Sequence, residues 1–154
     1  YYIINIGDRM RTYYVFNINN YFSYIYKKKP YKIYKMLESI MKENAHDMVL
    51  SYKLFEQIAL SFNKNKLNAY FKFNYETNPN YYYKDNIHVI MNNNEYTKLV
   101  ITNSNIKIKT NINFPIFLKS IYEYKENIFI CDFVNKDYFW LESIGKNEEE
   151  LSKT

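Results

Sequence analysis

The chain has 154 residues, of which 47% are hydrophobic, and it carries a formal net charge of +5 with one Cys and two Gly. This length suits one globular domain. A single Cys excludes an internal disulfide framework and suits a reducing compartment. Two Gly leave hardly any room for a glycine-rich phosphate loop. No stretch approaches the roughly 18 apolar residues of a membrane span, so we expect a cytoplasmic protein.

The two ends of the chain differ from the part between them. Residues 1–9 begin with an apolar run and end in Gly7-Asp8-Arg9, directly before Met10. Codons for these three residues can resemble a ribosome-binding site, so we hypothesise that residues 1–9 are translated leader and that the native protein starts at Met10. An intact mass that includes Tyr1 would contradict this.

Residues 145–154 are polar and charged, which is typical of a frayed tail. We therefore expect one domain over residues 10–144.

A strand and two helices are predicted at the start of this domain. Residues 11–18 place apolar side chains on both faces of a strand, which favours a central position in a sheet. Asn19-Asn20 is a helix-start signal. It precedes a short predicted helix at 21–28, in which Phe22 and Tyr26 are four residues apart and share one face. A second helix is predicted over 31–43.

A longer helix is predicted over residues 48–62, after a break at 44–47. At about 100° per residue, one apolar stripe forms its expected core face: Met48, Tyr52, Phe55, Ile58, Ala59 and Phe62. Leu50 and Gln57 lie on the polar side of this helix, and Leu54 lies at the border. If the helix is a neighbour of the one at 21–28, these three residues could form one patch with Phe22 and Tyr26. Aromatic anchors with a few leucines are typical of the centre of a protein interface.

The second half of the chain is predicted to consist mainly of strands. The expected elements are a helix at 66–75, a loop at 77–86 that carries three consecutive tyrosines, a strand at 87–91, a hairpin of 95–102 with 106–110, a helix at 114–123, and a hairpin of 128–133 with 138–141. The order of the elements predicts an α+β fold, a single domain with a largely antiparallel sheet and its helices packed on one side.

The sequence contains no motif that indicates catalysis or metal binding. His46 and His88 are far apart, and no Cys pair accompanies them. Cys131 falls inside a predicted strand, where a free Cys usually behaves as a small buried hydrophobe. Asp132 and Asp137 flank a hairpin turn, where carboxylates more often bond their own backbone than act as an acid–base pair. We therefore expect a protein that is not an enzyme and that needs no cofactor or metal. A small enzyme would be favoured only if Cys131 or Asp132 opened into a pocket.

Nucleic-acid binding remains an alternative. Aromatic residues and lysines alternate over residues 21–35, which could indicate single-strand binding by stacking. The pattern has the period of a helix, however, and the lysines are scattered along the chain, so a solvated lysine-rich surface is favoured and direct nucleic-acid binding is not expected. A nucleic-acid-binding module using Lys and Tyr would be favoured if the lysines lined one groove, and a steep salt dependence would reveal it.

Several short motifs, in their order and spacing, resemble one known family. The chain is similar to the sporulation inhibitor of replication family, SirA, over nearly the whole of residues 10–144. The residues that carry this resemblance are Arg11-Thr-Tyr-Tyr-Val-Phe-Asn-Ile18, Tyr21-Phe22, Tyr26, Leu54-Phe-Glu-Gln-Ile58, Cys131-Asp-Phe133 and Tyr138-Phe-Trp-Leu141.

The resemblance implies a non-enzymatic α+β protein that inhibits the initiation of DNA replication during sporulation. Members of the family bind the N-terminal domain of the initiator DnaA and thereby block its assembly at the origin. Phe22 and Tyr26 match aromatic residues of the family's first partner-binding site. Leu54 and Gln57 occupy positions of its second site, with different side chains. The resemblance thus implies a masking surface made by two helices.

Overall fold

The computed structural model of the chain describes residues 10–42 and 48–144, and it describes side chains for residues 10–42 and 51–144. The proposed leader (1–9), the helix break at 44–47 and the polar tail (145–154) lie outside the described residues. The strands are β1 (Arg11–Ile18), β2 (Ala59–Leu60), β3 (Tyr81–Lys84), β4 (Ile87–Met91), β5 (Tyr96–Ile101), β6 (Ile106–Thr110), β7 (Ile128–Asp132) and β8 (Asp137–Trp140). The helices are α1 (Asn20–Tyr26), α2 (Pro30–Lys42), α3 (Met48–Ile58), α4 (Lys64–Tyr75) and α5 (Phe117–Tyr124).

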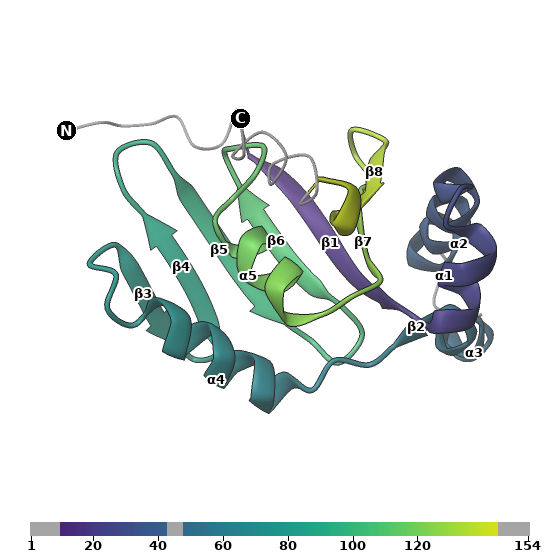
Figure 1. Cartoon of the computed structure of the whole chain (residues 1–154), viewed down its shortest axis with the longest axis horizontal. Coiled ribbons are helices and arrows are strands. Elements are labelled where there is room, and N and C mark those ends of the chain that lie inside the picture. The colour runs from purple at the N-terminus through teal and green to yellow at the C-terminus, as the bar shows by residue number, and fades with distance from the viewer. Residues whose placement is uncertain (1–9, 43–47, 145–154) are drawn as a thin grey trace.

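The strands form one antiparallel sheet with β1 near its middle. The strand order is β3-β4-β5-β6-β1-β7-β8, and β2 pairs with the end of β1. Val15 of β1 lies opposite Ile106 of β6 on one side and opposite Ile130 of β7 on the other. The predicted central position of residues 11–18 and the predicted α+β class are therefore confirmed (Figure 1).

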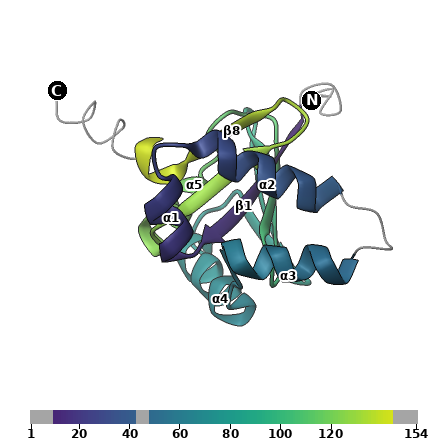
Figure 2. The same ribbon diagram turned by 90° about the vertical axis from the view of Figure 1, so that its right-hand side faces the viewer.

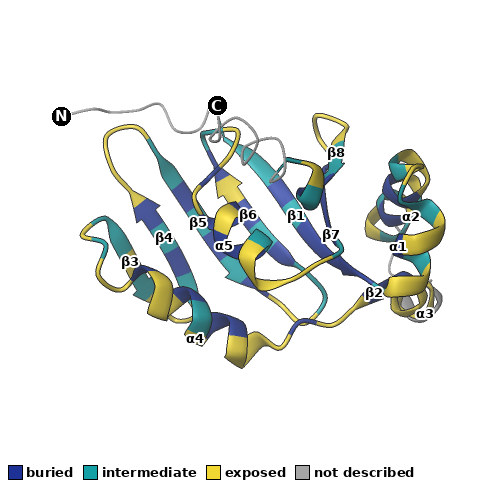
Figure 3. Ribbon diagram, viewed as in Figure 1, coloured by how far each residue is buried: buried dark blue, intermediate teal, exposed yellow. Residues whose placement is uncertain are grey.

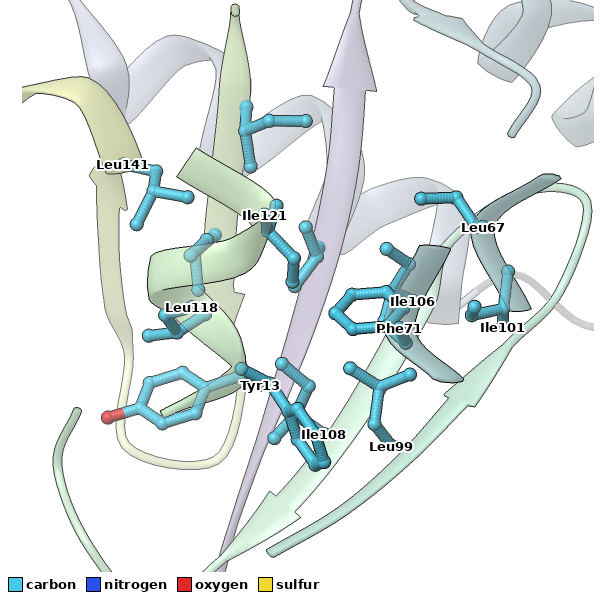
Figure 4. Packing of buried hydrophobic residues seen from close by; sticks show 14 of the residues in the cluster. Tyr13, Leu67, Phe71, Leu99, Ile101, Ile106, Ile108, Leu118, Ile121 and Leu141 are labelled. Carbon is cyan, nitrogen blue, oxygen red and sulfur yellow. The ribbon is translucent and has the colours of Figure 1, made fainter. Parts of the chain in front are cut away.

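The side chains of β1 alternate between two separate hydrophobic clusters. Tyr13 and Val15 belong to a cluster that α4 and α5 cover, and we call this side of the sheet the α4/α5 face. Figure 4 shows Leu118 and Ile121 of α5 above this face. Phe16 and Ile18 belong to a second cluster with side chains of α2 and α3, on what we call the α2/α3 face.

The helices are thus divided between both faces of the sheet, whereas the sequence analysis placed them on one side. The physical reason is that β1 and β7 are apolar on both faces, and each apolar face must be buried by some element. All five residues of β7 are buried. Figure 3 shows dark blue, buried residues concentrated on β1 and β7 and yellow, exposed residues on the outer sides of the helices.

The three consecutive tyrosines lie in a strand, so the predicted loop at 77–86 is wrong over residues 81–84, whereas residues 77–80 and 85–86 lie in no helix or strand. Residues 81–84 form β3, in which Tyr82 pairs with Val89 of β4. The turn between the two strands consists of Asp85 and Asn86, whose φ angles are 53° and 62°. Two consecutive positive φ values are the geometry of a tight hairpin turn, and Asn and Asp tolerate it better than other non-glycine residues. The hairpin is therefore closed without glycine.

The long helix ends four residues earlier than predicted. It stops at Ile58 because the next two residues, β2, pair with the end of β1, and Ile18 lies opposite Ala59. The predicted core stripe is also shifted. Phe55, Ile58 and Ala59 are buried, as expected, but Tyr52 is 59% exposed and Ser51 takes the buried position.

Candidate partner-binding surface

The short helix α1 starts where the sequence signal placed it, and Asn19 caps it. The Asn19 side-chain oxygen accepts a hydrogen bond from the Phe22 backbone N–H at 2.8 Å. The backbone carbonyl of Asn19 accepts a hydrogen bond from the Ser23 backbone N–H at 2.9 Å. A side-chain cap of this kind satisfies one of the free N–H groups at the start of a helix. A seven-residue helix is marginal by itself, so it depends on such contacts.

Asn19 also joins α1 to the end of α3. Its backbone N–H donates to the Ile58 carbonyl at 2.9 Å, and its side-chain amide donates to the Gln57 carbonyl. The start of α1 and the end of α3 are therefore neighbours, which is the condition that the sequence analysis left open. Figure 2 shows α1, α2 and α3 together on one side of the molecule.

Contacts with the other end of the chain fix α1 in position. Asn127, between α5 and β7, accepts a hydrogen bond from the Ser23 hydroxyl and donates one to the Asn20 side chain, both at 2.8 Å. At the other end of α1, the Lys27 ammonium lies 2.7 Å from a Glu142 carboxylate oxygen and 4.5 Å from the centre of the Trp140 ring. The helix is thus attached to the sheet at both of its ends.

Phe22 and Tyr26 are half-buried and lie against each other. Their ring centroids are 5.7 Å apart, with an interplanar angle of 27°, and both pack against the cluster of the α2/α3 face. Two further tyrosines of α1 are more open, since Tyr21 is 70% and Tyr24 is 87% exposed, and the Tyr21 ring lies edge-on to Phe22 at 6.0 Å. These exposed rings make α1 a candidate interaction surface, since contiguous exposed apolar area marks such sites.

Two of the three predicted residues of α3 lie outside its buried side. Leu54 is 42% exposed and Gln57 is also exposed, as their places on the helix indicated. The structure brings Gln57 next to the start of α1 through Asn19. Tyr52, expected in the core, is exposed instead, and it lies on the other side of the buried stripe from Leu54. The side chain of Leu50 lies outside the described ones.

Cys131 and His88, the free thiol and the described histidine, are both buried. Cys131 is fully buried, and burial raises the pKa of its thiol, which makes it a poor nucleophile. His88 is also fully buried. Within residues 10–42 and 48–144 no cluster of three potential metal ligands occurs. No helix in these ranges is long and apolar enough to span a membrane.

Both hairpin acids contact the first strand, and one of them also bonds the turn. Asp132, with a side chain 1% exposed, accepts from the Arg11 guanidinium at 3.1 Å and from the Asn135 backbone N–H at 3.1 Å. Asp137, half exposed, also contacts Arg11 at 3.1 Å. The bond from the Asn135 backbone agrees with the predicted role of Asp132 as turn support, whereas the contact of Asp137 is with Arg11 of β1.

We expect Asp132→Asn to lower the free energy of unfolding by about 2 kcal/mol, because hydrogen bonds to charged groups are worth roughly 1.5–3 kcal/mol and the site is buried. Asp137→Asn should cost less than about 1 kcal/mol, since its ion pair with Arg11 is exposed. Urea denaturation of the two variants measures this difference. Equal losses would contradict the assignment of Asp132 as the main anchor.

Comparison with known proteins identifies the family of the chain. No curated protein matches the chain. A family model described as "Sporulation inhibitor of replication protein SirA" matches residues 11–145. The match includes every strand from β1 to β8, and it contains α1 and α3. The predicted resemblance is therefore confirmed, and the chain belongs to the SirA family of sporulation inhibitors of replication.

Proposed function

We propose that this protein inhibits replication by binding the N-terminal domain of the initiator DnaA through α1 and the end of α3. The observation that supports the proposal is the joint between these helices at Asn19, which places Phe22 beside the end of the helix that carries Gln57. Phe22 and Tyr26 supply half-buried aromatic anchors, and Leu54 extends the apolar area. Half-buried aromatic side chains surrounded by smaller contacts are the usual composition of a binding hot spot.

The mechanism we propose is masking of the initiator, without catalysis. Binding occupies the surface through which the initiator domain assembles at the origin, so a stable assembly does not form there. Because the initiator acts on the chromosome, we place this activity in the cytoplasm. No cofactor or metal enters the mechanism.

The direct test is a binding measurement between this protein and the N-terminal domain of the initiator from the same host. We expect a one-to-one complex by calorimetry, with a negative heat-capacity change because apolar surface is buried. The complex should form with the isolated N-terminal domain and be absent when that domain is deleted from the initiator. No complex at micromolar concentration would contradict the proposal.

Removal of the α1 cap provides a second test, with a matched control inside the same chain. Asn63 caps α4 as Asn19 caps α1, by accepting a hydrogen bond from the backbone N–H of Lys66 at 3.1 Å. We expect Asn19→Ala and Asn63→Ala each to lower the free energy of unfolding by about 1 kcal/mol. Only Asn19→Ala should weaken initiator binding, by roughly fivefold or more, because only this change loosens α1 from α3.

Thermal unfolding and calorimetric titration of both variants would measure the two effects. If Asn63→Ala weakened initiator binding as much as Asn19→Ala, the effect would be one of general stability, and the docking role of α1 would be refuted.

A further inference from the structure

The α2/α3 face is covered over only part of its area. Its hydrophobic cluster takes buried strand residues from β1, β7, β8 and β2, and none from β3, β4, β5 or β6. In Figure 1, α4 and α5 lie over the other face, and α1–α3 lie at the end of the sheet next to β7 and β8. Among the described residues, no helix packs on the α2/α3 face of β3–β6. We call this area the open sheet face.

The pairing register defines the residues of the open sheet face. They are the strand positions in line with Tyr14 of β1, and they are partly or fully exposed: Tyr82, Lys84, Ile87, Val89, Met91, Tyr96, Lys98, Val100, Lys107 and Lys109. Four of these ten residues are lysines and none is acidic. The lysines that look scattered in the sequence are therefore gathered by the fold.

Two of these lysines lie directly opposite each other. Lys98 of β5 pairs with Lys109 of β6, and Lys107 is a diagonal neighbour of Lys98. Directly opposite side chains in an antiparallel pair have Cβ atoms roughly 4.5–5.5 Å apart, and like charges at this spacing are destabilising. No ion pair with a described residue compensates the charge of Lys98 or Lys109. An anionic ligand would relieve this repulsion.

Tyrosine rings flank the lysines on the same face. Tyr82 is 52% exposed, and Tyr96 is partly exposed two strands away. In the described part of the chain, neither ring stacks on another aromatic ring, whereas Tyr14 packs against Phe133 at 5.5 Å. Free aromatic faces beside lysines are the combination by which flat sheets bind single-stranded nucleic acid: the bases stack on the rings and the ammonium groups contact the phosphates.

We propose that the open sheet face binds single-stranded nucleic acid. This ligand fits better than an acidic protein segment, because the face combines unpaired positive charge with exposed rings that can take a base. The site is separate from the surface of α1 and α3, so both can be occupied in one molecule. Sequence-independent contact is expected, since backbone phosphates and base stacking carry no base-specific readout.

The experiment is a fluorescence-anisotropy titration of the full chain with a labelled oligo-dT single strand at several salt concentrations. If Lys98, Lys107 and Lys109 each contact one phosphate, the logarithm of affinity should fall with the logarithm of salt at a slope of about −2, since each phosphate contributes roughly −0.7 in single strands. Affinity should then drop about 20-fold between 50 and 200 mM salt. A flat salt dependence would overturn the proposal.

The most informative variant is Lys98→Glu. It replaces the like-charge pair with a cross-strand ion pair to Lys109, so the melting temperature should stay the same or rise. Binding of oligo-dT should nevertheless weaken by at least about fivefold, because an attraction to phosphate becomes a repulsion. Lys119→Glu, an equal change of charge at an exposed residue of α5, should keep wild-type affinity. If both variants weakened binding equally, the effect would be explained by net charge alone, and the proposed binding site on the open sheet face would be refuted.

Stacking and ligand class are tested separately. Tyr82→Leu should weaken binding by at least about fivefold, and Tyr82→Phe should not, because only the former removes the ring. A polyglutamate peptide of equal charge should bind at least about tenfold more weakly than oligo-dT. Equal binding of the peptide would assign the face to acidic protein segments and overturn the nucleic-acid proposal. Initiator binding should be unchanged in Lys98→Glu, so failure here is distinct from failure of the proposed function.

Discussion

Phe22→Ala should lower the affinity for the N-terminal domain of DnaA by at least about thirtyfold, equivalent to roughly 2 kcal/mol, which is the usual cost of removing a central aromatic anchor. Tyr26→Ala should have a similar effect, since the two rings stack on each other and share one site. Isothermal titration calorimetry with each variant measures the loss. Wild-type affinity in either variant would refute the assignment.

The half-burial of Phe22 requires a control for folding. Part of its ring packs against the cluster of the α2/α3 face, so truncation also costs stability. Phe55 supplies the comparison, because it is 7% exposed and belongs to the same cluster. Phe55→Leu should lower the melting temperature with little effect on affinity for the folded fraction. Phe22→Leu should instead lose affinity by more than its change in melting temperature explains.

The second large effect concerns pH and the buried histidine. The imidazole of His88 is fully buried. Its Nδ1 lies 2.7 Å from the Tyr81 hydroxyl and its Nε2 lies 2.7 Å from the Asn68 side-chain oxygen. These contacts fit a neutral ring that accepts from Tyr81 at Nδ1 and donates to Asn68 from Nε2. Burial lowers the pKa of His88 from 6.5 to about 4.

The folded protein should therefore lose stability as the pH falls from about 6.5 to about 4. Above pH 6.5 the ring is neutral in both states and contributes no pH dependence. Between the two pKa values only the unfolded chain takes up the proton, so the free energy of unfolding falls by about 1.4 kcal/mol per pH unit. The total loss is about 3 kcal/mol, and it is complete below pH 4.

Urea denaturation at several pH values, compared with His88→Gln, isolates this effect. Gln can accept from Tyr81 and donate to Asn68, but it does not titrate. The two proteins differ at this one position, so the difference between the two pH profiles reports His88 alone. Parallel profiles between pH 6.5 and 4 would contradict the burial of a neutral imidazole.

Much of the fold could be predicted from local pattern. The two hairpins and the central strand followed from alternation and turn residues. The strand β3 was missed because its run of tyrosines near Pro79 resembles a loop, and because its turn uses Asp85 and Asn86 with positive φ in place of glycine. The division of helices between two faces was implied by the apolar character of both sides of β1, but only the packing decides which helix takes which face.

The candidate sites were predictable only in part. The spacing of Phe22 and Tyr26 and the outward position of Gln57 are local properties of helices, and the sequence indicated both. The joint through Asn19 and the support from Asn127 depend on contacts between distant segments, as in the hydrogen bond from Ser23 to Asn127 across 104 residues. The pairing of Lys98 with Lys109 likewise required the strand register, which composition does not supply.

The central place of β1 has a consequence for the order of folding. Arg11 and Asp132, which join β1 to the last hairpin, are 121 residues apart in the chain. On the ribosome, β1 is synthesised about 90 residues before β6 and more than 100 residues before β7, its two long neighbours in the sheet. Contacts of such long range slow folding, because a large loop must close before they form. The contacts of Asn127 with Ser23 and Asn20 can therefore form only after residue 127 has been synthesised, so a shorter nascent chain lacks this support of α1.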